Sequence, residues 1–266
     1  MGILSNKQFV SWHNQEGLGI MKINNPPVNA LNKQVINETI HCLSEMEQDF
    51  EVRVVIVTGA GEKAFVAGAD IKELPGLLQG EKGTVVGFAT KGHEMFNKLD
   101  YFSKPTIAAV NGLCLGGGCE IAIACDLRVS SDKAQFGLPE INLGIFPGGG
   151  GTQRLPRLIG ESKAKELMYL GNYVSAQEAL NMGLVNKVVK DGEFWDLTIK
   201  LAKAIAKKPG MALNSIKQCV KMGMETSLKD GLNIEADLFD KIFLTEDAKE
   251  GINSFLEKRK PVFKHC

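Results

Sequence analysis

The sequence predicts an α/β core followed by a helical C-terminal region. Short apolar runs of strand length recur up to about residue 189. Between the first two runs, apolar residues fall on one helical face, which gives the strand–helix–strand order of an α/β fold. From Phe194 onward the pattern is helical only. A chain of 266 residues is long enough to bury a substantial core in this arrangement.

The expected elements follow in chain order. Apolar runs predict strands at 17–23, 52–59, 106–110, 127–131 and 184–189. The helix between the first two strands is indicated by a stripe of apolar residues, namely Val35, Ile36, Ile40, Leu43 and Met46. Helical patterning then covers segments 197–208, 212–224, 228–244 and 246–260.

We therefore divide the chain into a core at residues 1–193, which carries the active site, and a helical region at residues 194–266. A strand-free tail after an α/β core is often an oligomerisation or lid element. Helices that simply cover the core give the same pattern, so both interpretations stay open at this point.

Charge and cysteine content restrict the class of protein. The chain has 31 basic and 31 acidic residues, and a net charge of zero gives no electrostatic argument for a nucleic-acid partner. No apolar run has membrane-spanning length and no targeting segment is visible, so we expect a cytoplasmic protein without a membrane partner. The cysteines form no CxxC pair and are expected to be reduced thiols: Cys42, Cys114, Cys119, Cys125, Cys219 and Cys266.

A run of three glycines, Gly116 to Gly118, stands directly before a helical pattern. A bare helix N-terminus presents unpaired N–H groups and favours negative charge on whatever binds there. Segment 63–74 also follows a strand and passes through small residues into a helical pattern. Two such turns could direct two N–H groups at one oxygen and form an oxyanion hole. Taken singly, each segment is explained better by tight packing of a helix against a strand.

Two carboxylates stand near these glycines in the sequence. Glu120 lies in an otherwise apolar segment, where an unpaired charge is costly, and Glu140 follows Pro139. Two carboxylates beside an oxyanion hole hold and activate a water while one of them exchanges a proton with carbon. The alternatives are a buried salt-bridge partner for Glu120 and a loop or cap residue for Glu140.

Other catalytic motifs are missing from the sequence. Gly148 to Gly151 resemble a phosphate loop only loosely, because the Lys of a Walker motif does not follow. The four histidines lack metal-ligand spacing, and no Gly-x-Ser-x-Gly elbow occurs. The sequence therefore supports neither a metal site nor Ser–His hydrolysis.

Four stretches together resemble the crotonase superfamily, and most closely its enoyl-CoA hydratases. They are "KAFVAGADIKEL", "NGLCLGGGCEIAIACD", "AQFGLPEINLGIFPGGGGTQRLPRLIG" and "EKRKPVFK", in the order and spacing of the family. The resemblance runs from about Gly17 to the C-terminus. It implies a spiral of ββα units, a helical C-terminal trimerisation region, and a homo-oligomer that is a trimer or a hexamer built as a dimer of trimers.

The resemblance also assigns roles to residues. It implies an oxyanion hole from the N–H groups of Ala69 and Gly117, with Glu120 and Glu140 as the catalytic pair. It implies coenzyme A contacts from a set that extends into the tail: Ala69, Asp70, Ile71, Lys72, Gly117, Phe255 and Lys258. The last two would complete the site of a neighbouring subunit. From charge alone, the cations of the tail would be interpreted as a solvated basic end.

The expected activity is that of a lyase: reversible syn-addition of water to a trans-2-enoyl-CoA, giving a 3-hydroxyacyl-CoA in fatty-acid β-oxidation or related metabolism. No metal or other cofactor is expected, since coenzyme A is part of the substrate. Isomerases that resemble this pattern generally keep only one of the two glutamates, and this chain has both. An isomerase of the same superfamily and a non-catalytic acyl-CoA-binding protein are the alternatives.

Overall fold

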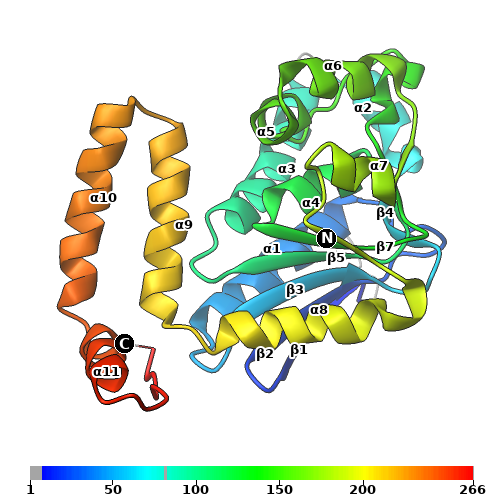
Figure 1. Ribbon diagram of the computed structural model, residues 1–266. Helices are drawn as coiled ribbons and strands as arrows, with labels where there is room; N and C mark the ends of the chain where they lie inside the picture. The colour runs from blue at the N-terminus through cyan, green and yellow to red at the C-terminus, as the bar shows by residue number, and fades with distance from the viewer. Residues whose placement is uncertain (1–7, 81–82, 266) are drawn as a thin grey trace, which may run out of the picture.

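Two sheets form the centre of the protein, of which the computed structural model describes residues 8–80 and 83–265 (Figure 1). The larger sheet has the strand order β1-β2-β3-β5-β7-β10 and the smaller has the order β4-β6-β8-β9. The strands of the larger sheet are β1 (Val10–Gln15), β2 (Leu18–Ile23), β3 (Val54–Gly59), β5 (Thr106–Val110), β7 (Leu127–Ser131) and β10 (Lys187–Val189). Those of the smaller sheet are β4 (Ala64–Ala67), β6 (Leu113–Leu115), β8 (Gln135–Gly137) and β9 (Val174–Ser175).

The chain winds through both sheets in repeated turns. β1 and β2 form an antiparallel hairpin, and from β2 onward the strands of the larger sheet run parallel. Each of β3, β5 and β7 is followed at once by a strand of the smaller sheet and then by helix. In this ββα order the helix carries the chain back to the end at which the previous strand began. The next strand of each sheet therefore runs parallel to its neighbour. The α/β prediction is confirmed.

The helices between these strands include α1 (Lys33–Gln48), which carries the predicted apolar stripe. After β4 come η1 (Ile71–Glu73), α2 (Leu74–Leu78) and α3 (Thr84–Asp100). α4 (Gly117–Ala124) follows β6, and η2 (Pro139–Leu143), α5 (Gly151–Ile159) and α6 (Glu161–Leu170) follow β8. α7 (Ala176–Asn181) connects β9 with β10.

The strands of the larger sheet were easier to predict than those of the smaller one. The expected strands at 106–110 and 127–131 coincide with β5 and β7, whereas the run at 184–189 forms a strand only from Lys187. The sequence analysis did not identify β1 or the strands of the smaller sheet, of which the longest has four residues. Such short segments carry too few residues for a period of two to be visible.

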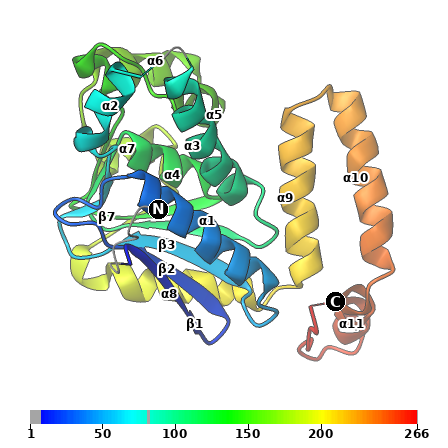
Figure 2. The same cartoon turned by 180° about the vertical axis from the view of Figure 1, so that it is seen from behind.

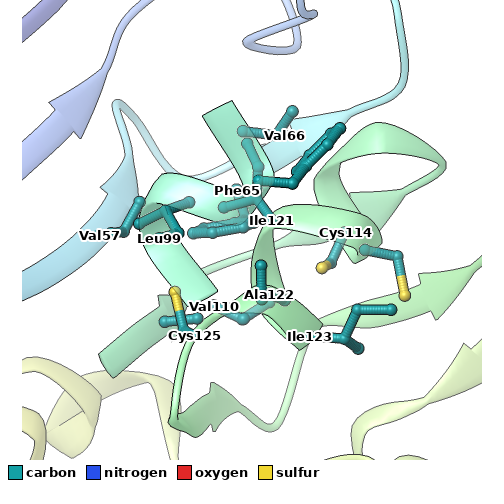
Figure 3. Packing of buried hydrophobic residues seen from close by; sticks show 14 of the residues in the cluster. Val57, Phe65, Val66, Leu99, Val110, Cys114, Ile121, Ala122, Ile123 and Cys125 are labelled. Atoms are coloured by element: carbon teal, nitrogen blue, oxygen red, sulfur yellow. The ribbon is translucent and has the colours of Figure 1, made fainter. Parts of the chain in front are cut away.

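The most deeply buried helix is α4, in which every residue from Gly118 to Ala124 is buried. Figure 3 shows Ile121, Ala122 and Ile123 of this helix packed among side chains from β3, β4, α3 and β5. Four cysteines belong to this buried cluster, namely Cys42, Cys114, Cys119 and Cys125, whereas Cys219 lies outside it; none of these five described cysteines forms a disulfide. Burial raises the pKa of Cys125 to about 12, so this thiol is protonated at neutral pH.

The C-terminal part is helical throughout its described residues. α8 (Asp191–Ala206) packs along the larger sheet, where Phe194 and Ala202 contact a second apolar cluster containing Ile20 and Ile56. α9 (Gly210–Met224) and α10 (Leu228–Phe243) then form a hairpin that stands beyond the end of the sheet, followed by α11 (Glu246–Leu256) (Figure 2).

The division of the chain at residue 193 stays a prediction, and residue 194 lies within α8. No helix in the described ranges combines the length and the apolarity that crossing a membrane requires.

Candidate active site

The three glycines at the start of α4 meet three different neighbours. Gly116 has a φ of 51°, and a Cβ at this position would lie 2.8 Å from Glu140 Oε1. A Cβ on Gly117 would lie 2.8 Å from Leu31 Cδ1, and one on Gly118 would overlap the carbonyl oxygen of Val66. Tight packing therefore explains Gly118, while Gly116 is required by backbone conformation and by the carboxylate beside it.

Two backbone amides are unused where the turn after β4 meets the turn before α4. Gly68, with a φ of 81°, donates its N–H to Leu115 O at 2.8 Å, and its Cα lies 3.3 Å from the Cβ position on Gly116. Leu31 donates its N–H to the carbonyl oxygen of Gly68, and its own carbonyl oxygen accepts the N–H of Asp70. Ala69 lies between these two residues, so its N–H points away from Leu31. Within the described residues, neither Ala69 N–H nor Gly117 N–H has a hydrogen-bond acceptor.

Glu120 is held by backbone amides of the loop before α5. Only 4% of the residue is exposed, and its Oε1 accepts hydrogen bonds from the N–H groups of Gly149 at 2.7 Å and Gly151 at 2.8 Å. Burial raises the pKa of Glu120, and the two amides, together with the charges of Arg154 and His93, act in the opposite direction. Among the ion pairs of the described residues none includes Glu120, so the interpretation of this residue as a salt-bridge partner is wrong.

Glu140 lies in the first turn of η2 and contributes no side-chain cap to it. Its Oε2 is buried and has no hydrogen-bond partner in the described part of the chain. Burial, with a smaller contribution from the charge of Glu120, raises the pKa of Glu140 to about 7. A carboxyl with this pKa is available both as an acid and as a base near neutral pH.

The remaining predicted contact residues lie in two places. Asp70 is partly buried and its Oδ1 accepts the N–H of Lys72 at 3.0 Å, while the Lys72 side chain is exposed. Asp70 directly precedes η1 and Lys72 lies within it, close to Ala69 in the sequence; the side chain of Ile71 lies outside the described part. Phe255, at the end of α11, is 82% exposed, and Lys258 is also exposed. α11 lies at the lower end of the α9–α10 hairpin in both views, well apart from α4 (Figures 1 and 2).

Sequence reasoning missed the part that the second glycine cluster plays. It compared Gly148 to Gly151 with a phosphate loop, whereas the structure directs two of these amides at Glu120. The signal was present in the sequence, because the cluster immediately precedes a helix and the first N–H groups of a helix need acceptors.

The described residues bring together two unused amides and two carboxyl groups, of which Glu120 is held by amides and Glu140 has a buried Oε2 without a partner. Such an arrangement can stabilise an oxygen that gains negative charge and can exchange a proton through a carboxyl group. No cluster of three or more His, Cys, Asp or Glu side chains suited to a metal ion occurs in the described ranges.

Comparison with known proteins agrees with this geometry. The family described as Enoyl-CoA hydratase/isomerase matches residues 13–265. The chain is 45% identical to a short-chain-enoyl-CoA hydratase of Clostridium acetobutylicum, over 91% of this chain and 92% of the relative. It is 44% identical to a crotonyl-CoA hydratase of Syntrophomonas wolfei, over 94% and 95% of the two chains.

Among solved structures, a crystal structure of an enoyl-CoA hydratase from Bacillus anthracis superposes with a TM-score of 0.92 at 37% identity, covering 97% of this chain and 100% of that one. Sequence and structure thus agree over nearly the whole chain. It belongs to the enoyl-CoA hydratase/isomerase family.

Proposed function

We propose that this protein is an enoyl-CoA hydratase, a lyase that adds water reversibly to a trans-2-enoyl-CoA and gives a 3-hydroxyacyl-CoA. The observation that carries this proposal is the position of Glu120 and Glu140 beside one glycine turn, where each has a raised pKa. The names of the two bacterial relatives support the same activity. Fatty-acid β-oxidation, or another route of acyl-CoA metabolism, is the proposed setting.

In the proposed mechanism the thioester oxygen accepts hydrogen bonds from Ala69 N–H and Gly117 N–H. The N-terminus of α4 adds its positive dipole end at Gly117. Both effects strengthen as the oxygen becomes an enolate, so they lower the barrier rather than merely bind the substrate. Withdrawal of electrons toward this oxygen makes the β-carbon electrophilic.

The two glutamates then divide the proton transfers. Glu120, whose Oε1 is occupied by two amides, takes a proton from the water that attacks the β-carbon. Glu140, with a pKa of about 7, helps to hold this water and delivers a proton to the α-carbon. Every group in this scheme belongs to the chain or the substrate, so the proposed reaction uses no metal or redox cofactor.

We also propose that the enzyme works as a homo-oligomer, either a trimer or a dimer of trimers. The α9–α10 hairpin exposes large apolar side chains, including Ile216, Val220 and Phe239, each at 60% exposure or more. A cavity of about 690 Å³ lies on this hairpin, lined by residues of both helices. Contiguous apolar surface of this kind favours burial against another copy.

Oligomerisation bears on the proposed coenzyme A site. Lys72, near Ala69 in the same chain, would contact the nucleotide, and Phe255 and Lys258 would approach it from a neighbouring subunit. Exposure of both tail residues is compatible with such an intersubunit contact. The cytoplasmic location stays a prediction, which cell fractionation tests.

The deciding experiment is a spectroscopic assay with crotonyl-CoA. A hydratase removes the absorbance of the conjugated enoyl thioester, and Glu120→Gln serves as the inactive control. An isomerase would instead convert a trans-3-enoyl-CoA and leave crotonyl-CoA unchanged. A non-catalytic binding protein would bind acyl-CoA in calorimetry and change neither substrate.

The oxyanion assignment has its own test. An amide-to-ester substitution at Gly117 removes one N–H and leaves the rest of the chain intact. Loss of one such donor lowers kcat by about 10²- to 10³-fold. The same substitution at Gly160, whose N–H donates to Pro156 O at 3.0 Å in another part of the fold, serves as the control. Equal activity of the two esters would remove Gly117 from the mechanism.

A further inference from the structure

A chain of polar contacts leads from helix α9 to the catalytic carboxylate Glu120. Lys221 on α9 forms an ion pair with Asp100 at the end of α3. The other oxygen of Asp100 accepts a hydrogen bond from Arg154 Nε at 2.9 Å. Arg154 Nη1 lies 3.4 Å from the carbonyl oxygen of Gly149, whose own N–H donates to Glu120 Oε1 at 2.7 Å. Four contacts thus connect the C-terminal hairpin with the active site.

The central pair of this chain is shielded from water. Asp100 is 7% exposed, and the side chain of Arg154 is 16% exposed. Arg154 Nη2 also donates to Asn97 Oδ1 at 2.6 Å, so α3 holds the guanidinium at two points. A planar guanidinium held at two points has a fixed orientation, in contrast to an exposed ion pair.

The loop before α5 is shaped around this guanidinium. Gly150 has a φ of 105°, and a Cβ at this position would overlap Arg154 Nη1. On the other side of the loop, His93 Nε2 lies 2.7 Å from the carbonyl oxygen of Gly148. Of the two amides that Glu120 uses, that of Gly149 therefore belongs to a loop that α3 and Arg154 hold from outside, and that of Gly151 belongs to the first residue of α5.

We propose that Arg154 is a positioning residue for Glu120, that Asp100 fixes its orientation, and that Lys221 extends this control to α9. This inference rests on the proposed role of Glu120 as the base in hydration. Arg154 does not touch the reacting atoms in this scheme; it holds the Gly149 amide in line with Glu120 and places a positive charge nearby.

The charged and titratable groups that face Glu120 set the sign of the expected change. They are His93 from α3, Glu140 from η2 and Arg154 from α5. The charge of Arg154 favours the ionised form of Glu120, so its removal raises the pKa of this carboxyl. A base of higher pKa is protonated over a wider pH range, and the acidic limb of the kcat/KM profile then moves to higher pH.

The first experiment compares Arg154→Gln with Arg154→Lys. We expect Arg154→Gln to lower kcat about 10-fold or more, with a small change in KM, and to move the acidic limb upward. Arg154→Lys keeps the positive charge but lacks the planar guanidinium. The acidic limb of its kcat/KM profile should therefore lie where it lies in the wild type, while kcat stays reduced. Unchanged kcat and an unchanged limb in a folded Arg154→Gln protein would overturn the proposal.

The second experiment tests the connection to α9 with a matched pair. Lys221→Met and Lys217→Met each remove one ion pair between α9 and the core. Lys217 contacts Asp126, whose side chain accepts hydrogen bonds from Thr106 and, among the described residues, none from the glycines at 148–151. We expect Lys221→Met to lower kcat about 3-fold or more and Lys217→Met to leave it unchanged. Equal effects of the two variants, with circular dichroism confirming the fold, would remove Lys221 from the chain.

A third measurement separates this proposal from the proposed reaction. Infrared difference titration follows the protonated carboxyl band of Glu120, assigned by its absence in Glu120→Gln, without any substrate. The midpoint should rise in Arg154→Gln and return in Arg154→Lys, whether or not the wild-type protein hydrates crotonyl-CoA. The same midpoint in wild type and Arg154→Gln would overturn the positioning role even if the hydratase assay succeeds.

Discussion

The Oε1 atom of Glu140 lies 2.8 Å from the position that a Cβ on Gly116 would occupy. A side chain at Gly116 is therefore excluded by the carboxylate, and the φ of 51° at Gly116 adds a second reason for glycine. Gly116, which precedes the proposed oxyanion amide of Gly117, therefore leaves room for the carboxyl of Glu140. This contact joins the two parts of the proposed mechanism, namely oxyanion stabilisation and proton transfer.

Gly116→Ala should displace Glu140 and lower kcat by about 10²-fold, because misplacement of a catalytic group by about 1 Å has an effect of this size. Gly61→Ala is the matched control, since Gly61 has a φ of 74° and nothing within 4 Å of its Cβ position. Gly116→Ala should also lose more stability than Gly61→Ala, because the φ of 51° and ψ of −123° at Gly116 lie outside the left-handed region that other residues adopt, and such strain costs about 1–3 kcal/mol. Steady-state kinetics and urea unfolding test this, and full turnover in Gly116→Ala would contradict it.

Glu120→Gln and Glu140→Gln should each lower kcat by about 10²- to 10⁴-fold, the usual range for loss of a general acid or base. Binding of a saturated acyl-CoA should change little, because neither carboxyl is expected to contact coenzyme A. Kinetics and calorimetry measure the two quantities. Glu94→Gln, an exposed carboxyl paired with Lys91 on α3, is the control. Near-normal turnover in either active-site variant would exclude that residue from proton transfer.

Activity should depend on pH through the number of protons on the glutamate pair. Hydration needs Glu120 ionised and Glu140 protonated, so kcat/KM should fall as pH rises through about 7, the pKa of Glu140. Dehydration starts with Glu120 protonated and Glu140 ionised, so the pair again carries one proton. Hydration and dehydration should therefore show the same dependence of kcat/KM on pH. Initial rates with crotonyl-CoA and with 3-hydroxybutyryl-CoA test this. A flat profile between pH 6 and pH 8 would contradict the assignment of Glu140.

Glu140 should also make the folded state less stable at alkaline pH. Its pKa is raised from 4.5 to about 7 in the fold, so the stabilising protonated form is fully present below pH 4.5 and is lost as pH rises through 7. Glu140→Gln should therefore be more stable than the wild type by about 3 kcal/mol at pH 8, with almost no difference at pH 4.5. Urea unfolding at one protein concentration measures this. An equal difference at both pH values would contradict it.

Lys258→Glu should raise KM strongly and leave kcat nearly unchanged, since it removes binding that substrate and transition state share. The effect should shrink as salt rises, because the proposed contact of Lys258 with coenzyme A is one between charges. Mixing inactive Glu140→Gln with Lys258→Glu then tests whether the site is shared between subunits. Activity at limiting substrate should exceed the sum of the parents after subunit exchange. Activity that stays at this sum would restrict the tail to its own subunit or to no site.

Much of the fold followed from patterns that the residues carry locally. β5 is a short, largely apolar run buried on both faces, and α1 has an apolar stripe, so both elements were visible in the sequence. β9, of two residues, and β6, of three, are strands because neighbours from distant turns pair with them. Such pairing is a property of the tertiary structure, and no local pattern reveals it.

The candidate site shows the same contrast. Glu120 and Glu140 were noticed as a carboxyl in an apolar segment and one before a glycine cluster, but each also had a structural explanation, and the resemblance to the crotonase superfamily made them the expected catalytic pair. The partners of Glu120 were not identified, since Gly149 and Gly151 act through backbone N–H groups that every residue possesses. Asp100 and Arg154 lie 54 residues apart, and their pairing depends on α3 and α5 meeting in the fold. The proximity of two such residues depends on the packing of the whole core, which no local sequence pattern shows.

The buried cysteines around α4 provide an internal chemical probe. Thiolate is the form that reacts with alkylating reagents, and burial raises the pKa of Cys114 and of Cys125. These thiols, and Cys119 within α4 itself, become accessible only when the helix separates from its neighbours. Their labelling rate therefore measures the free energy of local opening around the helix that carries Glu120, separately from global unfolding. A ligand that occupies the amide of Gly117 slows this labelling in proportion to its affinity for the closed state.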